Sequence, residues 1–365
     1  MENTKIYAEV LEDEAMEQFK SAIAQPYSVS GALMPDAHTG YSLPIGAVVA
    51  TDGFIYPAWV GYDIGCGMCA IQLKGIQRLD IEMFREDIFN GIYKSIPVGF
   101  SKNQHSTDYS LEGLTGDGME IAMAKDYQKA ICSLGGGNHF IEIGFDENDS
   151  IWIVIHSGSR GVGHGIAAHY IRKAHPENKC KEGHYGFSVN SEEGKNYIKD
   201  LNWCLEYALN NRKAMIGRVI DVVEGLIGGI DYNYDELINR NHNHAVESDG
   251  LWIHRKGATH AEEGMMGVIP GNMRDGSFIV RGKGNPESLS SSSHGAGRVM
   301  GRKQAKRDLD FNDFKEAMDG VTALVEESTL DEAPMAYKNI FEVMELQKDL
   351  VEVVAHIRPL INIKG

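Results

Sequence analysis

A histidine between four serines and a glycine turn is the residue of this chain best suited to phosphate chemistry. His294 lies in the stretch SSSSHGAGRVMGR, which ends at Arg302. Small residues let a ligand approach the backbone closely, and consecutive free amides can bind an anion. In this setting the imidazole could serve as an acid, a base, a metal ligand or a nucleophile. The alternative is a Ser/Gly loop with an incidental histidine, and this stretch alone does not decide between them.

Positive charge is dense just after His294, whereas the chain as a whole is acidic. The formal net charge is -17, from 52 acidic and 35 basic residues, which is the opposite of what a general nucleic-acid binder shows. A phosphate-rich partner must therefore be held locally, by a cleft or by metal ions. We expect the local basic run to form a track for phosphate; it comprises Arg298, Arg302, Lys303, Lys306 and Arg307.

A carboxylate and a thiol lie three residues apart in the glycine-rich segment GYDIGCGM. They are Asp63 and Cys66, directly after an apolar run. At this distance the two groups can share one divalent ion or bridge two ions, and the glycines allow the loop to fold around it. The competing explanation is a buried cysteine beside a turn aspartate, and the two explanations are about equally supported.

Two histidines lie at the ends of predicted strands, each beside a glycine loop. His139 follows GGGN and precedes FIEI, and His156 ends IWIVI and opens SGSRG, in which Arg160 follows. Each alone would more often be a structural histidine, but together they indicate a metal and phosphate site. The cluster NHNH adds His242 and His244, which point the same way only in an extended chain, so one of them alone is the expected ligand.

These candidates combine one thiolate, one carboxylate and three imidazoles. That mixture suits Mn²⁺, Zn²⁺, Fe²⁺ or Co²⁺ and is too soft for Mg²⁺ or Ca²⁺ alone. The residues come from four distant loops, whereas a structural metal is normally held by local pairs, so a catalytic metal site is predicted. Its expected ligands are Asp63, Cys66, His139, His156 and His242.

The elements that must position these residues form an ordinary globular protein. The chain has 365 residues, of which 42% are hydrophobic and 24% charged. It contains no run of 18 apolar residues, and its five cysteines follow no framework spacing, so we expect a soluble cytoplasmic protein without disulfides. No repeat or low-complexity linker interrupts the chain. We predict one α+β domain, residues 1–365, with central β-sheets flanked by helices.

Hydrophobic periodicity places the elements. The start MENTKIYAEV predicts a first strand, and short apolar runs with Gly and Pro between 31 and 73 predict further strands. Strands are also predicted for the apolar runs beside His139 and His156 and for those between 251 and 281. Residues 97–118 and 178–194 read as loops. The predicted helices span residues 12–24, 81–95, 118–130, 162–174, 195–228, a short segment within 231–247, 308–328 and 338–357.

Ten sequence blocks, in order, resemble the RtcB family of RNA-splicing ligases. They are MPDAHTG, GYDIGCGM, GGGNHFIE, IHSGSRGVG, the HN pair at 242 and 243, RKGA, IPGNM, SFIVRGKGN, SSHGAGRVMGR and PMAYKNI. The resemblance covers nearly the whole chain, and blocks in the family's order are specific where one alone would be weak. It includes His38 of MPDAHTG, the one other histidine in a site-like setting.

The resemblance implies an RNA ligase that uses GTP and two Mn²⁺ ions. Such an enzyme joins an RNA 3′-phosphate, or a 2′,3′-cyclic phosphate that it first opens, to a 5′-hydroxyl, in RNA repair or tRNA splicing. The family's guanylylated nucleophile falls on His294, and Arg160 would hold RNA phosphate. The five metal ligands carry over unchanged, with Cys66 bridging the ions. The nucleotide positions implied are Asn138, Glu142, Asn243, Pro270, Gly271, Asn272, Met273, Ser277, Gly295, Ala296, Gly297, Tyr337 and Lys364.

Two other functions compete with a ligase. A metal-dependent phosphoesterase would need the metal site but not the nucleotide positions, and a non-catalytic RNA- or nucleotide-binding homologue would need neither transfer step. The pairing of His294 with Lys364 and the PGNM turn discriminates, because only nucleotide transfer requires it. An accessory protein is compatible with all of these functions, as is a specialised RNA substrate.

Overall fold

Two main β-sheets form the centre of the protein in a computed structural model that describes residues 3–365. The first sheet has five strands in the order β1-β2-β3-β11-β10. Its strands are antiparallel neighbours except β1 and β2, which run parallel. Their bounds are Thr4–Ile6 (β1), Ser28–His38 (β2), Ile45–Asp52 (β3), Asn243–Ser248 (β10) and Leu251–Lys256 (β11).

The second sheet curves until its two end strands meet. Its order is β13-β14-β17-β6-β7-β5-β9, β16 pairs with β17, and β13 lies against β9, so the sheet is a nearly closed barrel. Two short pairs, β4 with β8 and β12 with β15, complete the strands. The bounds are Phe54–Ile55 (β4), Gly67–Leu73 (β5), Phe140–Phe145 (β6), Ile151–Ser157 (β7), Phe187–Ser188 (β8), Ile238–Asn241 (β9), Ala258–His260 (β12), Met266–Pro270 (β13), Ser277–Gly282 (β14), Ser291–Ser293 (β15), Thr322–Ala323 (β16) and Val351–Lys364 (β17).

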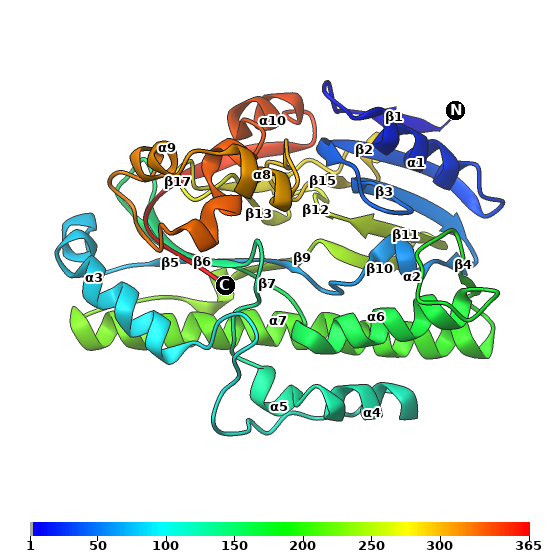
Figure 1. Cartoon of the computed structure of the whole chain (residues 1–365), viewed down its shortest axis with the longest axis horizontal. Coiled ribbons are helices and arrows are strands. Elements are labelled where there is room, and N and C mark those ends of the chain that lie inside the picture. Colours follow the sequence, from blue (N-terminus) through cyan, green and yellow to red (C-terminus); the bar gives the residue numbers. More distant parts are fainter. Residues whose placement is uncertain (1–2) are drawn as a thin grey trace.

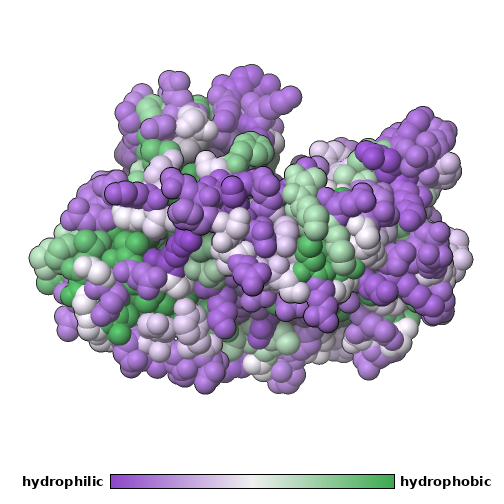
Figure 2. Space-filling view, turned by 90° about the horizontal axis from the view of Figure 1, so that it is seen from below, coloured by the Kyte–Doolittle hydropathy of each residue, from purple (hydrophilic) through white to green (hydrophobic). Residues whose placement is uncertain are grey.

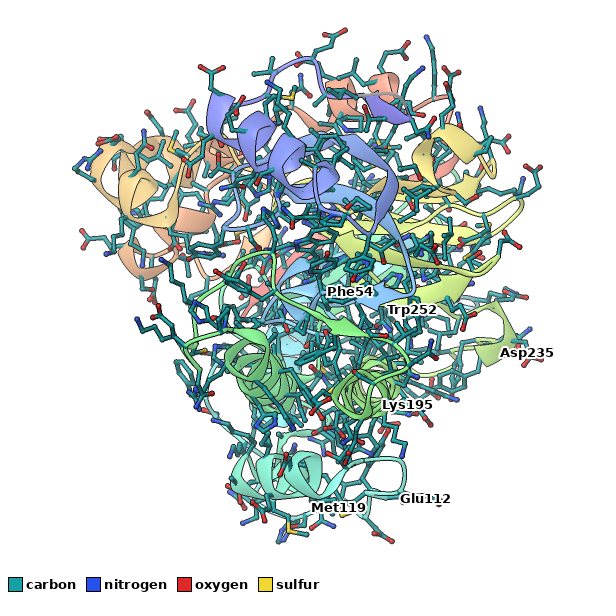
Figure 3. All side chains as sticks on the ribbon, turned by 90° about the vertical axis from the view of Figure 1, so that its right-hand side faces the viewer. Phe54, Glu112, Met119, Lys195, Asp235 and Trp252 are labelled. Carbon is teal, nitrogen blue, oxygen red and sulfur yellow. The ribbon has the colours of Figure 1, made fainter. Side chains whose placement is uncertain are left out.

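Helices cover the sheets on opposite sides (Figure 1). The long helix α7 runs beneath the sheets beside α6, with α4 and α5 below them, whereas α1, α8, α9 and α10 lie in the upper half of the view. Figure 3 shows the same layers from the side, from Met119 of α4 through Lys195 of α7 to Trp252 of β11. The bounds are Asp13–Ile23 (α1), Pro57–Val60 (α2), Arg78–Ser95 (α3), Gly116–Ala124 (α4), Tyr127–Ala130 (α5), Arg160–Ala174 (α6), Glu192–Leu226 (α7), Arg302–Asp308 (α8), Phe311–Ala317 (α9) and Ile340–Leu346 (α10).

The largest hydrophobic core lies between the barrel-like sheet and the helices α3 and α7. Ile71 and Ile153 of the sheet pack with Ile88 of α3 and Val219 of α7. Helix α7 begins where the Ser191 side chain accepts a hydrogen bond from the amide of Gly194, and one apolar face of it is buried along its length. This packing makes α7 the support on which the strand ends of the site rest.

The predicted architecture of central sheets with flanking helices is confirmed, and most helices lie where the periodicity placed them. The segment 118–130 is divided into α4 and α5, with Asp126 between them at a φ of 50°. The prediction of one helix over 338–357 is wrong, because after α10 the chain forms the strand β17. Its β-branched residues and Pro359 favour a strand over a helix. The helix predicted over 308–328 ends at Ala317, shortly before Gly320 at a φ of 85°.

The surface on the side of α4 and α5 is mostly hydrophilic, with hydrophobic side chains in separate patches (Figure 2). Within residues 3–365, no helix has the length and apolar character needed to cross a membrane. All five cysteines are free thiols, as expected. Of these, Cys66, Cys69, Cys132 and Cys204 are buried.

Candidate active site

Neighbouring strands of the barrel-like sheet bring the predicted metal ligands to one edge. Cys66 precedes β5, His139 precedes β6, and His156 lies near the end of β7. In the register of these strands Met68 and Phe140 both pair with His156, and Gly67 pairs with Asn241. Residues far apart in the sequence therefore meet because β6, β7, β5 and β9 are adjacent in the sheet.

The donor atoms of the five predicted ligands form a continuous chain of contacts. Sγ of Cys66 lies 3.2 Å from Nε2 of His139 and 3.1 Å from Nε2 of His156. Beyond these, Nε2 of His139 is 3.2 Å from Oδ2 of Asp63, and Nε2 of His156 is 3.3 Å from Nε2 of His242. The sulfur is central, with a carboxylate and an imidazole on one side and two imidazoles on the other.

This cluster fits a divalent transition metal. The donor atoms of Cys66, His139 and His156 all lie within 4.8 Å of one another, and the three residues are buried. Burial raises the pKa of the Cys66 thiol and lowers the pKa of the His156 and His242 imidazoles. Soft donors that face one another in a buried space are the ligand set that such a metal requires.

Local backbone contacts orient these side chains. The backbone carbonyl of Asn138 lies 3.1 Å from Nδ1 of His156, which leaves Nε2 facing the cluster. Gly135 has to be a glycine, because a Cβ there would lie 2.0 Å from Nδ1 of His139 and 2.7 Å from Nη1 of Arg160. The GGG segment thus allows the loop to lie directly against a predicted metal ligand.

A buried arginine on α7 connects the segments that carry the ligands. Nη1 of Arg212 donates to the carbonyl oxygens of Gly65 (2.9 Å) and Ser157 (2.8 Å), and Nη2 donates to Oδ1 of Asn241 (2.6 Å). These acceptors lie next to Cys66, His156 and His242 in the chain. The adjacent Asn211 donates to the carbonyl of Gly158 (3.1 Å). Sequence reasoning missed this pair, since a polar residue within a long amphipathic helix carries no site-like pattern.

Arg212→Gln is expected to destabilise the protein by about 3 kcal/mol or more, because glutamine leaves several buried carbonyl groups without a donor. Urea unfolding of the variant measures this loss, and bound metal in the folded fraction is expected to fall as well. The neighbouring Lys213, which is exposed on the same helix, provides the control substitution Lys213→Gln. Equal stability of Arg212→Gln and the control would contradict the positioning role of Arg212.

A pocket of about 260 Å³ lies beside the cluster and is shared by the predicted nucleophile and nucleotide residues. His156 and His294 both line it, and the rings of His242 and His294 are 4.9 Å apart. Ten of the predicted nucleotide residues are in its wall: Asn138, Pro270, Gly271, Asn272, Met273, Gly295, Ala296, Gly297, Tyr337 and Lys364. His38, Arg298, Arg302 and Asn362 also line it.

A buried aspartate holds the imidazole of His294. Oδ2 of Asp36 lies 2.6 Å from Nδ1 of His294 and accepts a hydrogen bond from its backbone amide (3.2 Å). Asp36 is fully buried, and its other carboxylate oxygen has no hydrogen-bond partner within the described chain. Because Nδ1 faces this carboxylate oxygen, Nε2 is the nitrogen of His294 on the side of the ring away from Asp36. The aspartate of MPDAHTG is therefore a site residue that the sequence analysis quoted but did not select.

Two of the three remaining predicted nucleotide residues, Glu142 and Ser277, lie just behind the pocket. Oε1 of Glu142 accepts a hydrogen bond from Ser277 (3.0 Å), and Oε2 accepts one from Asn362 (3.1 Å). Burial raises the pKa of Glu142 to about 7, although these hydrogen bonds favour the ionised form. Asn243 lies on the metal side instead, where it donates to the carbonyl of Asp63 (3.1 Å) and accepts from the amide of Gly257 (2.8 Å).

The raised pKa of Glu142 predicts a pH-dependent contribution to stability. The folded protein binds the proton more tightly than the unfolded chain, whose ordinary value is 4.5. The contribution is therefore fully present below 4.5 and is lost as the pH rises through about 7, for a total of about 3 kcal/mol. The difference in unfolding free energy between the wild type and Glu142→Gln should change by this amount across that range. Parallel curves, as expected for the exposed control Glu263→Gln, would contradict the prediction.

A buried glutamate forms ion pairs with basic groups at the pocket. Oε2 of Glu332 accepts hydrogen bonds from Lys364 (2.7 Å) and Tyr337 (2.7 Å), and Oε1 contacts Arg302 and, at 3.4 Å, Arg298. Burial favours the neutral acid, yet Lys364 and Arg302 hold the pKa of Glu332 at about 2. Glu332 thus fixes both Tyr337 and Lys364 in the wall of the pocket.

The expected phosphate track after His294 is largely neutralised within the chain. Arg298 and Arg302 pair with Glu332, Arg302 and Lys306 pair with Asp331, and Arg307 pairs with Asp308. Within residues 3–365, Lys303 is the member of this run without an ion pair. This run therefore carries less free positive charge than its sequence indicates, because Asp331 and Glu332 fold against it, and its role as a phosphate track stays a prediction.

His244 and Arg160 lie outside the Cys/His cluster. His244 turns away from the cluster and stacks on His260 at 4.5 Å, with Arg255 3.1 Å from its Nε2, so of the two neighbouring histidines only His242 joins the site. The chain passes from β9 to β10 at residue 242, which separates their directions. Arg160 begins α6 and donates to Ser133 (2.9 Å) and to the carbonyl of Gly99 (2.6 Å).

Comparison with known proteins identifies the family. A family model described as "tRNA-splicing ligase RtcB" matches residues 18–365. The chain belongs to the RtcB family. "RNA-splicing ligase RtcB" of Escherichia coli strain K12 is 34% identical over 97% of this chain and 95% of its own length. "tRNA-splicing ligase RtcB" of Methanococcus maripaludis strain S2 is 28% identical over 98% of this chain and 92% of its own.

Membership in the RtcB family confirms the resemblance drawn from the ordered blocks. A second Escherichia coli protein, "RNA-splicing ligase RtcB2" of strain ATCC 25922, is 28% identical over 97% of this chain and 93% of its own length. These relatives match the chain over nearly its entire length and their own. The likeness therefore extends over both main sheets and all segments that form the site.

Proposed function

We propose that this protein is an RNA ligase that joins a 3′-phosphate or 2′,3′-cyclic phosphate end to a 5′-hydroxyl end through a guanylylated His294, using GTP and Mn²⁺. The observation that carries the proposal is the shared pocket, in which His294 lies beside a Cys/His cluster, with His156 in both. The names of the relatives describe RNA-splicing and tRNA-splicing ligases. A phosphoesterase would require the cluster but not the nucleotide residues that share the pocket with His294.

The chemistry follows from the free nitrogen of His294. Nε2 attacks the α-phosphorus of GTP, a P–N bond forms, and the bond to pyrophosphate breaks. An oxygen of the RNA 3′-phosphate then attacks the same phosphorus and displaces the histidine. In the last step the 5′-hydroxyl oxygen, which loses its proton, attacks the RNA phosphorus, and GMP leaves. Each of these steps exchanges one phosphorus bond for another, so no oxidant is needed. A 2′,3′-cyclic phosphate is first opened by water, whose oxygen bonds to phosphorus as the bond to the 2′-oxygen breaks and the 2′-oxygen takes up a proton.

Two groups of donor atoms share Cys66 and would hold two Mn²⁺ ions. One group is Asp63, Cys66 and His139, and the other is Cys66, His156 and His242. When bound, the ions supply positive charge that orients phosphate oxygens and offsets charge in the transition state. This arrangement accounts for phosphate chemistry in a chain of net charge -17 whose basic run is already paired.

The pocket walls suit a nucleotide. Backbone from the Pro270–Met273 turn and from Gly295–Gly297 lines the pocket, and Tyr337 and Lys364 are held there by Glu332. We propose that Glu142, Ser277 and Asn243 contribute to nucleotide binding indirectly, by holding neighbouring residues in place. Arg160, whose charge acts on Asp63, would bind RNA phosphate.

Asp36 is proposed to position His294 as aspartate does in a catalytic triad, by holding one ring nitrogen so that the other is free. Asp36→Asn is expected to slow adduct formation roughly 10²- to 10⁴-fold. Single-turnover labelling with GTP at saturating metal measures this rate. Thermal unfolding of the variant serves as the control for folding, and an unchanged rate in a folded Asp36→Asn protein would exclude the positioning role.

The test of the function uses RNA with a labelled 3′-phosphate and a separate RNA with a 5′-hydroxyl end. A ligase retains the label within a joined RNA in a reaction that requires GTP, whereas a phosphoesterase releases it as inorganic phosphate without GTP. Binding without either product would indicate a non-catalytic homologue. We further propose that residues 1–365 act as one catalytic unit in the cytoplasm, where Cys66 remains a free thiol.

A further inference from the structure

An aromatic side chain at the rim of the site is fully exposed. Phe100 has 104% relative exposure, the highest among the large hydrophobic residues of the described chain. It lies between α3 and α4, in the segment 97–118 that the sequence predicts as a loop. Neither the nucleotide pocket nor the metal cluster includes it. The steps proposed above leave this residue without a role.

The loop that carries Phe100 is firmly attached to the protein. The carbonyl of Pro97 accepts from the amide of Leu134 (2.9 Å), and Val98 forms a bridge with the same residue. On the other side of Phe100, the Asn103 side chain donates to the carbonyl of Ile131 (2.7 Å) and accepts from Arg218 (2.8 Å). The exposed ring is therefore presented from a backbone that is fixed on both sides.

The same loop touches the edge of the site. The carbonyl of Gly99 accepts from Nη2 of Arg160 at 2.6 Å, and the Cα of Gly99 lies 3.8 Å from where a Cβ of Gly136 would be. Gly136 belongs to the loop that leads into Asn138 and His139. Phe100 thus directly follows a residue that contacts both the arginine proposed for RNA phosphate and the loop of a metal ligand.

Positive charge accompanies the aromatic ring. Lys125 lies over the start of α6, with Cδ 3.6 Å from a Cβ position at Gly161, and it has no ion pair within residues 3–365. Lys102 lies two residues after Phe100, pairs with Asp126 and donates to the carbonyl of Lys125 (2.9 Å). An exposed aromatic ring that follows a contact of an arginine, in a segment that also carries a lysine, is a combination that binds single-stranded nucleic acid, by stacking a base and neutralising its phosphate.

We propose that Phe100 is a stacking platform for a base of the RNA, at one of the nucleotides next to the ends that are joined. This inference rests on the proposed ligase function and adds a subsite to it. Arg160 holds the backbone phosphate, and the base of the same strand lies on the ring of Phe100. Phe100 would then position an RNA end while accepting any base, because every base offers a π-face.

A double-mutant cycle between protein and RNA tests the subsite. The wild type, Phe100→Ala and Phe100→Trp are assayed for sealing of RNA with ordinary ends and of RNA in which the terminal nucleotide of either strand is abasic. With ordinary RNA, Phe100→Ala should raise KM about 5- to 100-fold, and Phe100→Trp should stay close to the wild type. With the abasic nucleotide at the stacked end, Phe100→Ala and the wild type should have the same KM. Leu79→Ala, an exposed residue on α3, is the matched control.

The outcomes separate the subsite from other roles of Phe100. Equal loss of sealing by Phe100→Ala on ordinary RNA and on both abasic RNAs would overturn the proposal, since that pattern indicates a structural role or a protein partner. An unchanged KM in Phe100→Ala would overturn it as well. Labelling of the wild type with GTP is carried out first. Failure of that step would refute the ligase function itself, which is a result distinct from failure of the subsite.

Discussion

His294→Ala is expected to abolish the covalent guanylate adduct, with a loss of at least about 10³-fold relative to the wild type. The side chain is the nucleophile in the proposed reaction, and alanine offers no nitrogen to the α-phosphorus. Nδ1 faces Asp36 at 2.6 Å, Nε2 is proposed as the reacting nitrogen, and the ring lies 4.9 Å from that of His242 in the metal cluster. The measurement is incubation with α-labelled GTP and Mn²⁺, followed by detection of acid-labile label on the protein.

The control for this experiment is His164→Ala, which removes an exposed histidine of α6 outside the pocket. It should be labelled like the wild type. Labelling of His294→Ala at the wild-type level would show that another residue is the nucleophile. Since the His294 side chain is 14% exposed and lines a pocket, replacing it with alanine should leave the fold intact, which thermal unfolding verifies.

Cys66→Ala is expected to remove bound metal and, with it, adduct formation. The sulfur lies between the two groups of donors, 3.2 Å from His139 and 3.1 Å from His156, so its loss weakens both proposed sites at once. Changes to residues that merely support a metal ligand lower affinity 10- to 100-fold, and removal of a shared ligand should exceed about 100-fold. Elemental analysis of the purified protein and GTP labelling measure the two effects.

Cys69→Ala is the matched control, because Cys69 lies three residues further on, at 0% exposure, and packs into the hydrophobic core instead of the cluster. It should retain metal and labelling, with at most a modest loss of stability. Full metal occupancy together with normal labelling in Cys66→Ala would exclude Cys66 as an essential ligand.

Local sequence patterns predicted residues that the structure brings together in the Cys/His cluster. Cys66, His139 and His156 were selected because polar groups with metal-binding chemistry stand beside glycines at the ends of apolar runs, and these strand ends do meet at one edge of the sheet. The choice between His242 and His244 could not be made locally. It depends on the passage from β9 to β10, which places the two rings in different clusters.

Contacts between distant segments could not be predicted. Asp36 and His294 are 258 positions apart, and no local pattern pairs them. Asp331 and Glu332 likewise pair with the basic run that follows His294, and hydrophobic periodicity does not predict this contact. The first part of the strand β17 was predicted as a helix because the apolar residues of 338–357 recur at helical as well as at strand spacing. Pairing with β14 and β6 favours the strand. These features are set by tertiary packing, which overrides local preference.

The most direct test of the central claim measures whether the guanylate bound to the protein is consumed when RNA is joined. Wild-type protein labelled with α-labelled GTP is separated from free nucleotide and then mixed with RNA carrying 3′-phosphate and 5′-hydroxyl ends. The proposed mechanism predicts that the label leaves His294, that GMP is released, and that joined RNA forms in equal amount. Label that remains on the protein while RNA is joined, or RNA phosphate that is released without joining, would contradict it.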